Sequence, residues 1–289
     1  MVLGRQTVER RQLGLALRRL RSRTGASQQD AGNAIGRTGA RISQVETGTG
    51  TLSVEELGKL LDFYGVNGDE RATLLALGAE ARKRRRQPWQ VYTDVLPDAF
   101  QRLADLEEDA TAISAYEAGI IPGLVQSPDY IRAIISVGNG LWWQTSDDET
   151  ERRIKFRLQR QRRVFETGQS KRVHVIFTED ALDNVVGSTS VMRGQAAHLI
   201  QLTEDLPDLL VQVIPSKAAG NPALGGGMIL LDFDGAPTIG FIASLYGPNT
   251  YYGEPEDIAP MTRVFQHLSK LALSTDESKL LFSKKMKEH

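Results

Sequence analysis

The sequence contains no cysteine, which excludes disulfide bonds, thiolate nucleophiles and cysteine-ligated zinc or iron–sulfur centres. It also contains no apolar run near the roughly 20 residues that span a bilayer. Its first residues, MVLGRQTVERR, lack the apolar centre of a signal peptide. We therefore expect a cytoplasmic protein that has no membrane contact and does not use cysteine chemistry.

Motifs for catalysis and for metal or cofactor binding are missing as well. The histidines do not show the His-x-x-x-His spacing of a metal site; they are His174, His198, His267 and His289. Gly225-Gly226-Gly227 is followed by a strand-like segment, and no Lys-Ser/Thr pair comes after it. The glycines therefore favour a turn over a phosphate loop. No Gly-x-Ser-x-Gly elbow occurs, which leaves only a Ser/His/Asp triad assembled from distant segments as a route to such catalysis. We expect no enzyme, no cofactor and no metal.

Length and charge indicate two domains of different character. The chain has 289 residues, more than the roughly 100–200 of a typical domain. Residues 1–88 carry a formal charge of +7 and the remainder −8. A basic part joined to an acidic part is typical of a nucleic-acid-binding module attached to a body that avoids nucleic acid. Gln87-Pro88-Trp89 breaks the helical pattern, so we expect domains 1–87 and 88–289.

Helical periodicity and capping residues predict five helices in the first domain. A leucine stripe indicates the first over Arg10–Arg23, and Ser27 is suited to cap a short second helix, Gln28–Ile35. Gly36 supplies a turn before Thr38 caps a third helix over 39–46. The fourth helix follows the capping box SVEE and the fifth ends in ARKRRR, a run that fits a solvated helix end or a phosphate contact.

The second and third helices have the length and the glycine turn of a helix-turn-helix, whose second helix enters the DNA major groove. Arg41 is suited to a bidentate pair with guanine, and Gln44 to a contact with adenine or a phosphate. Thr38 and Ser43 suit either target, and Gln28 lies where a helix start can hold a phosphate.

The segment from LRRLRSRTGASQQD to LLDFYGV resembles the DNA-binding domain of the XRE, or phage-repressor-like, family. The resemblance implies that Glu46 braces the fold by pairing with an arginine of the first helix. Two residues depart from the pattern. Gly32 replaces an alanine, at a cost of up to about 1 kcal/mol in helix propensity, and Arg37 replaces an apolar residue and either extends to solvent or contacts a phosphate. The DNA-binding residues implied are Gln28, Arg37, Thr38, Ala40, Arg41, Ser43, Gln44 and Thr49.

The second domain mixes helical and strand periodicity and is predicted to be α+β, with a small, mainly antiparallel sheet. The Asp234-Gly235 turn suggests that the later strands form an antiparallel meander. Expected helices are 98–117, 130–136, one opened by SDDE at 146–149, 190–204, 257–273 and 276–287, and expected strands are 173–177, 209–214, 228–233 and 238–243.

The segments YEAGIIPGLVQSPDYIRAI, VVGSTSVMRGQAAHL and LALSTDES resemble the C-terminal domain of actinobacterial, antitoxin-like regulators of the WhiJ type. The resemblance implies a transcriptional regulator of development or secondary metabolism that is paired with a small protein encoded nearby. A single helix-turn-helix domain offers a limited contact area for DNA. We therefore also expect a homodimer that binds double-stranded DNA at a pseudo-palindromic operator.

Three features of the second domain allow more than one interpretation. In Trp142-Trp143 and in Tyr251-Tyr252 adjacent side chains point to different sides, so one of each pair packs inside. The other suits a ligand pocket, a partner interface or plain core packing, and we favour core packing. The segment Arg152–Arg163 has seven basic residues. It suits an acidic partner, flanking DNA or the domain's own acidic residues, and we favour the last. A small-molecule effector is the alternative to a protein partner.

Overall fold

The structure is a computed structural model that describes residues 7–82, 92–94, 99–139, 141, 146–166, 170–244 and 249–289. The chain divides into two compact units, Met1–Asp109 with Gly235–Ile258 and Ala110–Asp234 with Ala259–His289. The expected boundary at Gln87-Pro88-Trp89 lies outside the described residues, so the division into domains 1–87 and 88–289 stays a prediction.

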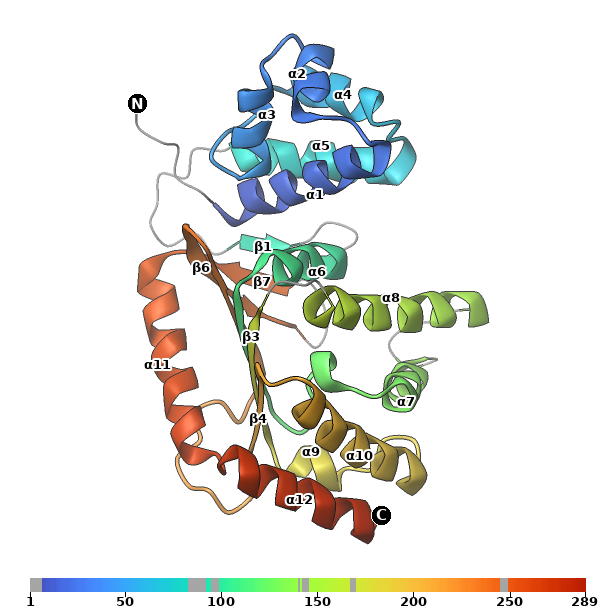
Figure 1. Cartoon of the computed structure of the whole chain (residues 1–289), viewed down its shortest axis with the longest axis vertical. Helices are drawn as coiled ribbons and strands as arrows, with labels where there is room; N and C mark the ends of the chain where they lie inside the picture. The colour runs from blue at the N-terminus through green and yellow to red at the C-terminus, as the bar shows by residue number, and fades with distance from the viewer. Residues whose placement is uncertain are drawn as a thin grey trace. The chain divides into compact units, whose positions relative to one another are not determined.

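The first unit begins with five helices that share one apolar core, which we call the head (residues 7–82; Figure 1). The leucine stripe of the first helix is buried in this core, and Ile42 and Val45 meet it from the third helix. The prediction of five helices is confirmed. They are α1 Val8–Thr24, α2 Gln28–Ala34, α3 Gly39–Glu46, α4 Val54–Phe63 and α5 Gly68–Arg82.

Gly32 of α2 is required by a close approach of backbone. A Cβ at this position would lie 2.7 Å from the carbonyl carbon of Thr38 and 2.8 Å from the carbonyl oxygen of Arg37. Real Cβ atoms essentially never approach that closely, and neither backbone group can move without shifting α3. The expected loss of helix propensity is therefore outweighed by the room that glycine gives the turn.

We predict that Gly32→Ala destabilises the head by about 1–3 kcal/mol, the usual cost of overpacking, although alanine is the better helix former. Gly58→Ala in α4 is the matched control, because the nearest atom to its Cβ would be the Arg71 Nη2 at 3.6 Å. The control should stabilise the head by up to about 1 kcal/mol. Amide hydrogen exchange of α1–α4 measures the stability of the head in both variants. The same change in stability for Gly32→Ala and Gly58→Ala would contradict the steric argument.

The described remainder of the first unit comprises helix α6 (Ala99–Asp109), strands β1 (Tyr92–Asp94), β6 (Ala236–Ile242) and β7 (Asn249–Tyr252), and the first residues of α11 (Pro255–Leu271). Helix α6 packs against α1, where Arg11 pairs with Asp109 and Arg19 with Asp105. Strands β1 and β6 both pair antiparallel with β7. The turn expected at Asp234-Gly235 lies between β5 (Met228–Phe233) and β6, whereas β7, the antiparallel partner of β6, is not among the expected strands.

The second unit is a sheet with helices on both faces, its strands in the order β5-β2-β3-β4 (Figure 1). Phe177 of β3 stacks on Phe282 of α12, and His174, on the opposite face, makes an edge contact with Phe265 of α11. The strands are β2 Ala112–Glu117, β3 Arg172–Thr178, β4 Leu209–Ile214 and β5 Met228–Phe233. The helices are η1 Gly123–Val125, α7 Pro128–Gly138, α8 Asp147–Phe165, α9 Asp180–Asp183, α10 Thr189–Asp205, α11 Pro255–Leu271, which starts in the first unit, and α12 Thr275–Glu288.

The prediction of a mainly antiparallel sheet is wrong for this unit, because the sheet is mixed. Strand β2 pairs parallel with β3, and β3 parallel with β4, while β5 is antiparallel to β2. Helices α7 and α8 join β2 to β3, and α9 and α10 join β3 to β4. Such long helical connections carry the chain back to the starting edge, so the next strand runs parallel to the last.

The expected helix over Asp98–Glu117 is wrong in its second half. Helix α6 ends at Asp109, and the last six residues of that span form β2. Two neighbouring strands, β3 and β5, supply the hydrogen-bond partners of β2, and Ile113 and Tyr116 are buried on its two faces. The tertiary environment thus overrides the helical spacing of the apolar residues.

Candidate nucleic-acid interface

Local caps fix the geometry of the two helices of the motif. The hydroxyl of Ser27 accepts the backbone N–H of Asp30 at 3.1 Å, and the Asp30 carboxylate accepts the N–H of Ser27 at 2.9 Å. Thr38 caps α3 in the same way through the N–H of Arg41. Between the helices, Gly36 has a φ of +68°, a left-handed conformation that glycine adopts without strain. These contacts define the angle at which α3 leaves the turn.

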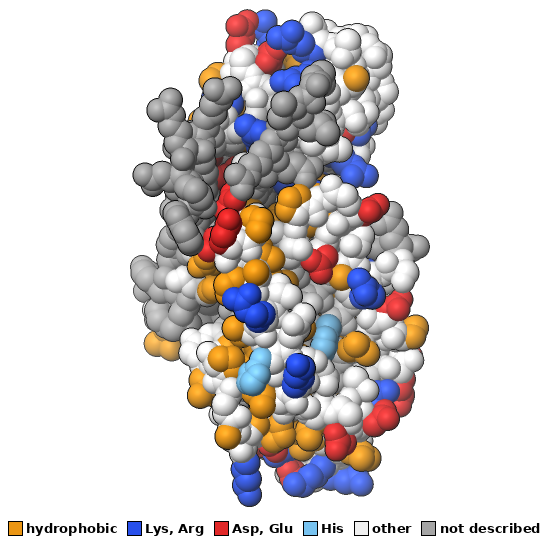
Figure 2. Space-filling view, turned by 90° about the vertical axis from the view of Figure 1, so that its left-hand side faces the viewer, with side chains coloured by type: hydrophobic (Ala, Val, Ile, Leu, Met, Phe, Trp, Pro, Cys, Tyr) orange, Lys and Arg blue, Asp and Glu red, His pale blue; other side chains and the backbone are white. Residues whose placement is uncertain are grey.

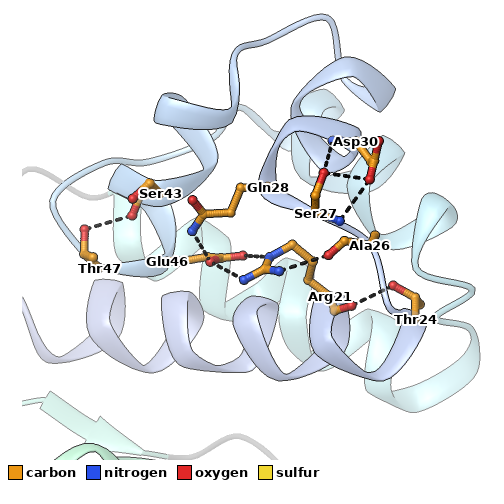
Figure 3. A network of polar contacts seen from close by, with 9 residues as sticks. All are labelled: Arg21, Thr24, Ala26, Ser27, Gln28, Asp30, Ser43, Glu46 and Thr47. Atoms are coloured by element: carbon orange, nitrogen blue, oxygen red, sulfur yellow. Dashed lines mark hydrogen bonds and ion pairs between the residues drawn. The ribbon is translucent and has the colours of Figure 1, made fainter.

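Glu46, at the end of α3, is the centre of a polar network that ties α1, α2 and α3 together (Figure 3). Its carboxylate, only 3% exposed, accepts hydrogen bonds from Arg21 Nε at 2.6 Å and Arg21 Nη2 at 3.1 Å. Gln28 Nε2 donates a third bond at 2.8 Å. The hydrogen bond to Glu46 raises the pKa of Arg21, so the guanidinium keeps its charge. The pairing of Glu46 with an arginine of the first helix is confirmed.

Figure 3 also shows how Gln28 lies: its amide nitrogen is directed at Glu46, not away from the head. The residue remains partly exposed at the start of α2, where the helix presents free backbone N–H groups. A phosphate at this position would therefore meet the helix N-terminus together with the remaining polar surface of Gln28. Its role as a phosphate anchor stays a prediction.

Arg41 and Gln44, expected as separate base contacts, are bonded to each other. Arg41 Nη1 donates to Gln44 Oε1 at 3.2 Å, and Arg41 Nη2 donates to the carbonyl of Thr51. Both side chains lie on the outer face of α3 and are partly exposed. The loop after α3 thus holds the guanidinium in place, and Thr51 is a positioning residue that the sequence did not indicate.

An open groove of about 570 Å³ lies beside the turn, lined by Gly36, Arg37, Thr38, Arg41 and Glu56. Arg37 Nε bonds to Glu56 Oε1 at 2.6 Å, an ion pair that neither expectation for Arg37 included. Hydrogen bonds from the Ser53 backbone and from Arg37 lower the pKa of Glu56. The sequence identified Glu56 as part of a capping box but not as a wall of this groove.

The remaining expected contact residues surround the same surface. Ala40 and Thr38 are exposed, and Ser43 is partly exposed on α3. Thr49 Oγ1 donates to the Gln44 carbonyl at 3.0 Å, so Thr49 closes the C-terminus of α3. Guanidinium, amide, hydroxyl and methyl groups are thereby gathered on one helix face, and these are the groups that recognise base edges and phosphates.

Within the described ranges, the other features singled out in the sequence do not form a second polar site of this kind. No group of three His, Asp or Glu side chains in the described part of the chain could hold a metal ion, and the histidines seen on the face in Figure 2 do not adjoin one another. Gly225 ends a turn and Gly226-Gly227 lead into β5, in line with the expected turn. Tyr251 is buried against Phe241, while Tyr252 is partly exposed, as expected for that pair. Trp142 and Trp143 lie outside the described residues.

Glu117, at the end of β2, is a partly buried carboxyl with an unusual pKa. Burial raises this pKa to about 7, although the positive charge of Arg160 opposes the change. Between the ordinary pKa near 4.5 and the folded value, the folded state binds more protons than the unfolded state. The stability of the second unit should therefore fall as pH rises through this window and stay lower above it.

We predict that Glu117→Gln is more stable than the wild type at pH 8, by about 2 kcal/mol, and equally stable near pH 4.5. Denaturant unfolding followed by tryptophan fluorescence at both pH values measures the difference. Glu204→Gln, which removes an exposed carboxyl, should change neither value. A Glu117→Gln effect independent of pH would show that titration is not its cause.

Among the described residues, no helix is long and apolar enough to cross a membrane.

Comparison with family models matches both parts of the chain. Residues 12–74 match a model described as a helix-turn-helix domain, and residues 100–283 match one described as a domain of unknown function (DUF5753). The first match covers the turn and all eight expected DNA-contacting residues, and it indicates a DNA-binding regulator of the XRE-like type. No curated protein and no solved structure matches the chain.

Proposed function

The chain belongs to the family defined by the domain of unknown function DUF5753, and because a helix-turn-helix domain precedes that domain, we propose that it is a sequence-specific transcriptional regulator. The observation that carries the proposal is the outer face of α3, where Arg41 and Gln44 lie together beside the groove lined by Arg37 and Thr38. Arg41 reads guanine, and Gln44 contacts an adenine or a phosphate.

Phosphates are held by residues around this face. Gln28 and the N-terminus of α2 grip one phosphate, and Arg37 releases Glu56 to contact another. Thr38, Ala40, Ser43 and Thr49 complete the contact surface. One head covers only a few base pairs, so two copies bind a pseudo-palindromic operator with half-sites about 34 Å apart or a multiple of it.

The second domain regulates when the first domain binds DNA. By resemblance to antitoxin-like regulators of the WhiJ type, it receives a signal from a small partner protein and acts in development or secondary metabolism. The alternative is a one-component repressor that binds a small-molecule effector. Co-purification from the native host separates them, since a chain that always emerges alone counts against the partner protein.

Footprinting on the promoter region of its own gene tests DNA recognition. We expect two protected half-sites related by a dyad, and loss of protection when the bases within them are changed. Protection that ignores such base changes would overturn sequence-specific recognition.

We predict that Gln28→Ala weakens binding to every DNA site by a similar factor, about fivefold, because a single phosphate contact is lost. Gln29→Ala is a matched control at the next position, where the side chain bonds within the motif to Asn33 and to the N–H of Gly39. Fluorescence anisotropy with several operator variants measures the factor. A loss confined to one base pair would place Gln28 at a base instead of at a phosphate.

A further inference from the structure

Helix α8 presents three partly buried arginines, Arg153, Arg157 and Arg160, at the i, i+4, i+7 spacing of one helix face. The outer two have acidic partners. Arg153 Nε lies 3.1 Å from Glu149 Oε1, and Arg160 interacts with the charge of Glu117. The described residues supply no carboxylate within ion-pair distance of Arg157, the middle one.

The nearest polar partner of Arg157 is a neutral one. Its Nη1 lies 3.5 Å from Oε1 of Gln126, in the loop 121–127 that leads into α7. The backbone of this loop is already bonded elsewhere. Gln161 donates to two of its carbonyl groups at 2.8 and 2.9 Å, and Gln195 binds a third carbonyl at 2.8 Å and an N–H at 2.6 Å. These bonds hold the backbone of the loop in place, and Gln126 Oε1 is its one atom within hydrogen-bond distance of Arg157 among the described residues.

A partly buried guanidinium without a carboxylate is unfavourable for the fold. Loss of water and the like charges of Arg160 and Arg153 lower the pKa of Arg157 to about 10. Its side chain nevertheless keeps part of its surface exposed, and none of its nitrogens is among the fully buried atoms that lack a partner. A small solute can thus reach the charge that the protein leaves uncompensated.

We propose that Arg157 anchors a binding site for the carboxylate of a small organic acid. Arg153 pairs with Glu149, which it shares with the exposed Arg152, and Arg160 interacts with the charge of Glu117. Arg157 is thus the arginine of this face that has no carboxylate partner among the described residues, and a monoanion neutralises its charge. A phosphate would bring a second negative charge that Arg157 alone does not neutralise. The planar guanidinium offers paired donors that fit a carboxylate, and low water content strengthens the contact.

This site goes beyond DNA recognition and gives the second unit a small-molecule signal to respond to. The binding of the acid is measured directly and does not require DNA. A failure here would therefore leave the helix-turn-helix proposal untouched, and a failure of DNA recognition would leave this one untouched.

Thermal unfolding of the full-length protein at pH 8, titrated with sodium acetate and sodium benzoate, tests the proposal. Sodium chloride and sodium phosphate at equal ionic strength are the comparison salts. We expect either acid to raise the midpoint, since a ligand of the folded state stabilises it. The apparent Kd should rise about tenfold or more in Arg157→Met and stay unchanged in Arg162→Met, which removes the same charge from an exposed position of α8. No response of the wild type to either acid, an equal response to chloride or phosphate, or an unchanged Kd in Arg157→Met would overturn the proposal.

NMR of the arginine Nε–Hε groups gives a readout that does not depend on stability. The Arg157 signal, identified by its absence from the Arg157→Met spectrum, should shift in a saturable manner with acetate, while the Arg162 signal stays in place. Should Arg157→Met not fold, Arg157→Lys serves instead, because it keeps the charge and loses the paired donors. A wild-type spectrum in which no arginine signal saturates with acetate would refute the site.

Discussion

Replacing Arg21 by methionine is expected to destabilise the head by about 3–5 kcal/mol, the cost of leaving a buried charge without its partner. Arg21 makes two of the three hydrogen bonds that Glu46 accepts, and the third, from Gln28, is neutral. The Glu46 side chain is 3% exposed, so water cannot replace the guanidinium. The end of α3 would then lose its anchor to α1.

Hydrogen exchange followed by mass spectrometry measures this loss of stability within the head. The backbone amides of α1 and α3 should exchange about a hundredfold faster or more in the variant. Arg23→Met is the matched control: this arginine is 60% exposed and lies 3.9 Å from Glu70, so its removal should matter little. The double variant Arg21→Met/Glu46→Met should recover most of the loss, because no buried charge remains. Single and double variants that are equally unstable would show that packing, and not charge, is decisive.

The sequence predicts the head well because its signals are local. Ser27, Thr38 and Ser53 each cap a helix within three residues, and the capping pattern sets where α2, α3 and α4 begin. The second unit is harder, since the direction of a strand depends on connections of many residues. Because the apolar spacing of residues 112–117 favours a helix, the sequence does not reveal β2 or the crossover from β2 to β3, and the parallel pairing cannot be inferred from it.

The same contrast holds for the candidate site. The outward face of α3 follows from helical spacing, so the exposed positions of Thr38 and Ala40 could be predicted. The hydrogen-bond partners of Arg37 and Arg41 could not be predicted from the sequence. Glu56 lies 19 residues from Arg37, and Thr51 lies 10 residues from Arg41, and only the folded loop between α3 and α4 brings them together. Side-chain pairs of this kind depend on loop geometry, which has no periodic signal in sequence.

The bond from Arg41 to Gln44 bears on how the proposed operator is read. A guanidinium fixed by Gln44 and the Thr51 carbonyl has few conformations left to lose on binding DNA. Its exposed donors would therefore meet a base edge in a defined direction. The two residues should act as one unit, so substituting both is expected to cost less than the sum of the single substitutions.

We predict that Arg41→Ala loses up to about 3 kcal/mol at one base pair of the operator and little at the others. Sequencing of DNA selected by the full-length protein measures the preference at each position. Arg37→Ala is the contrasting variant. Arg37 lies in the same groove but pairs with Glu56, and its loss should weaken all sites evenly and reduce the salt dependence by about one phosphate contact.

Arg41→Lys separates charge from shape in this contact. Lysine keeps the positive charge but lacks the planar pair of donors that fits guanine, so the affinity for non-specific DNA should stay near that of the wild type. The preference at the one affected base pair should fall nearly as far as in Arg41→Ala. A lysine variant that retains full base preference would mean that Arg41 contributes only charge, and base reading would then have to come from the remaining side chains of α3.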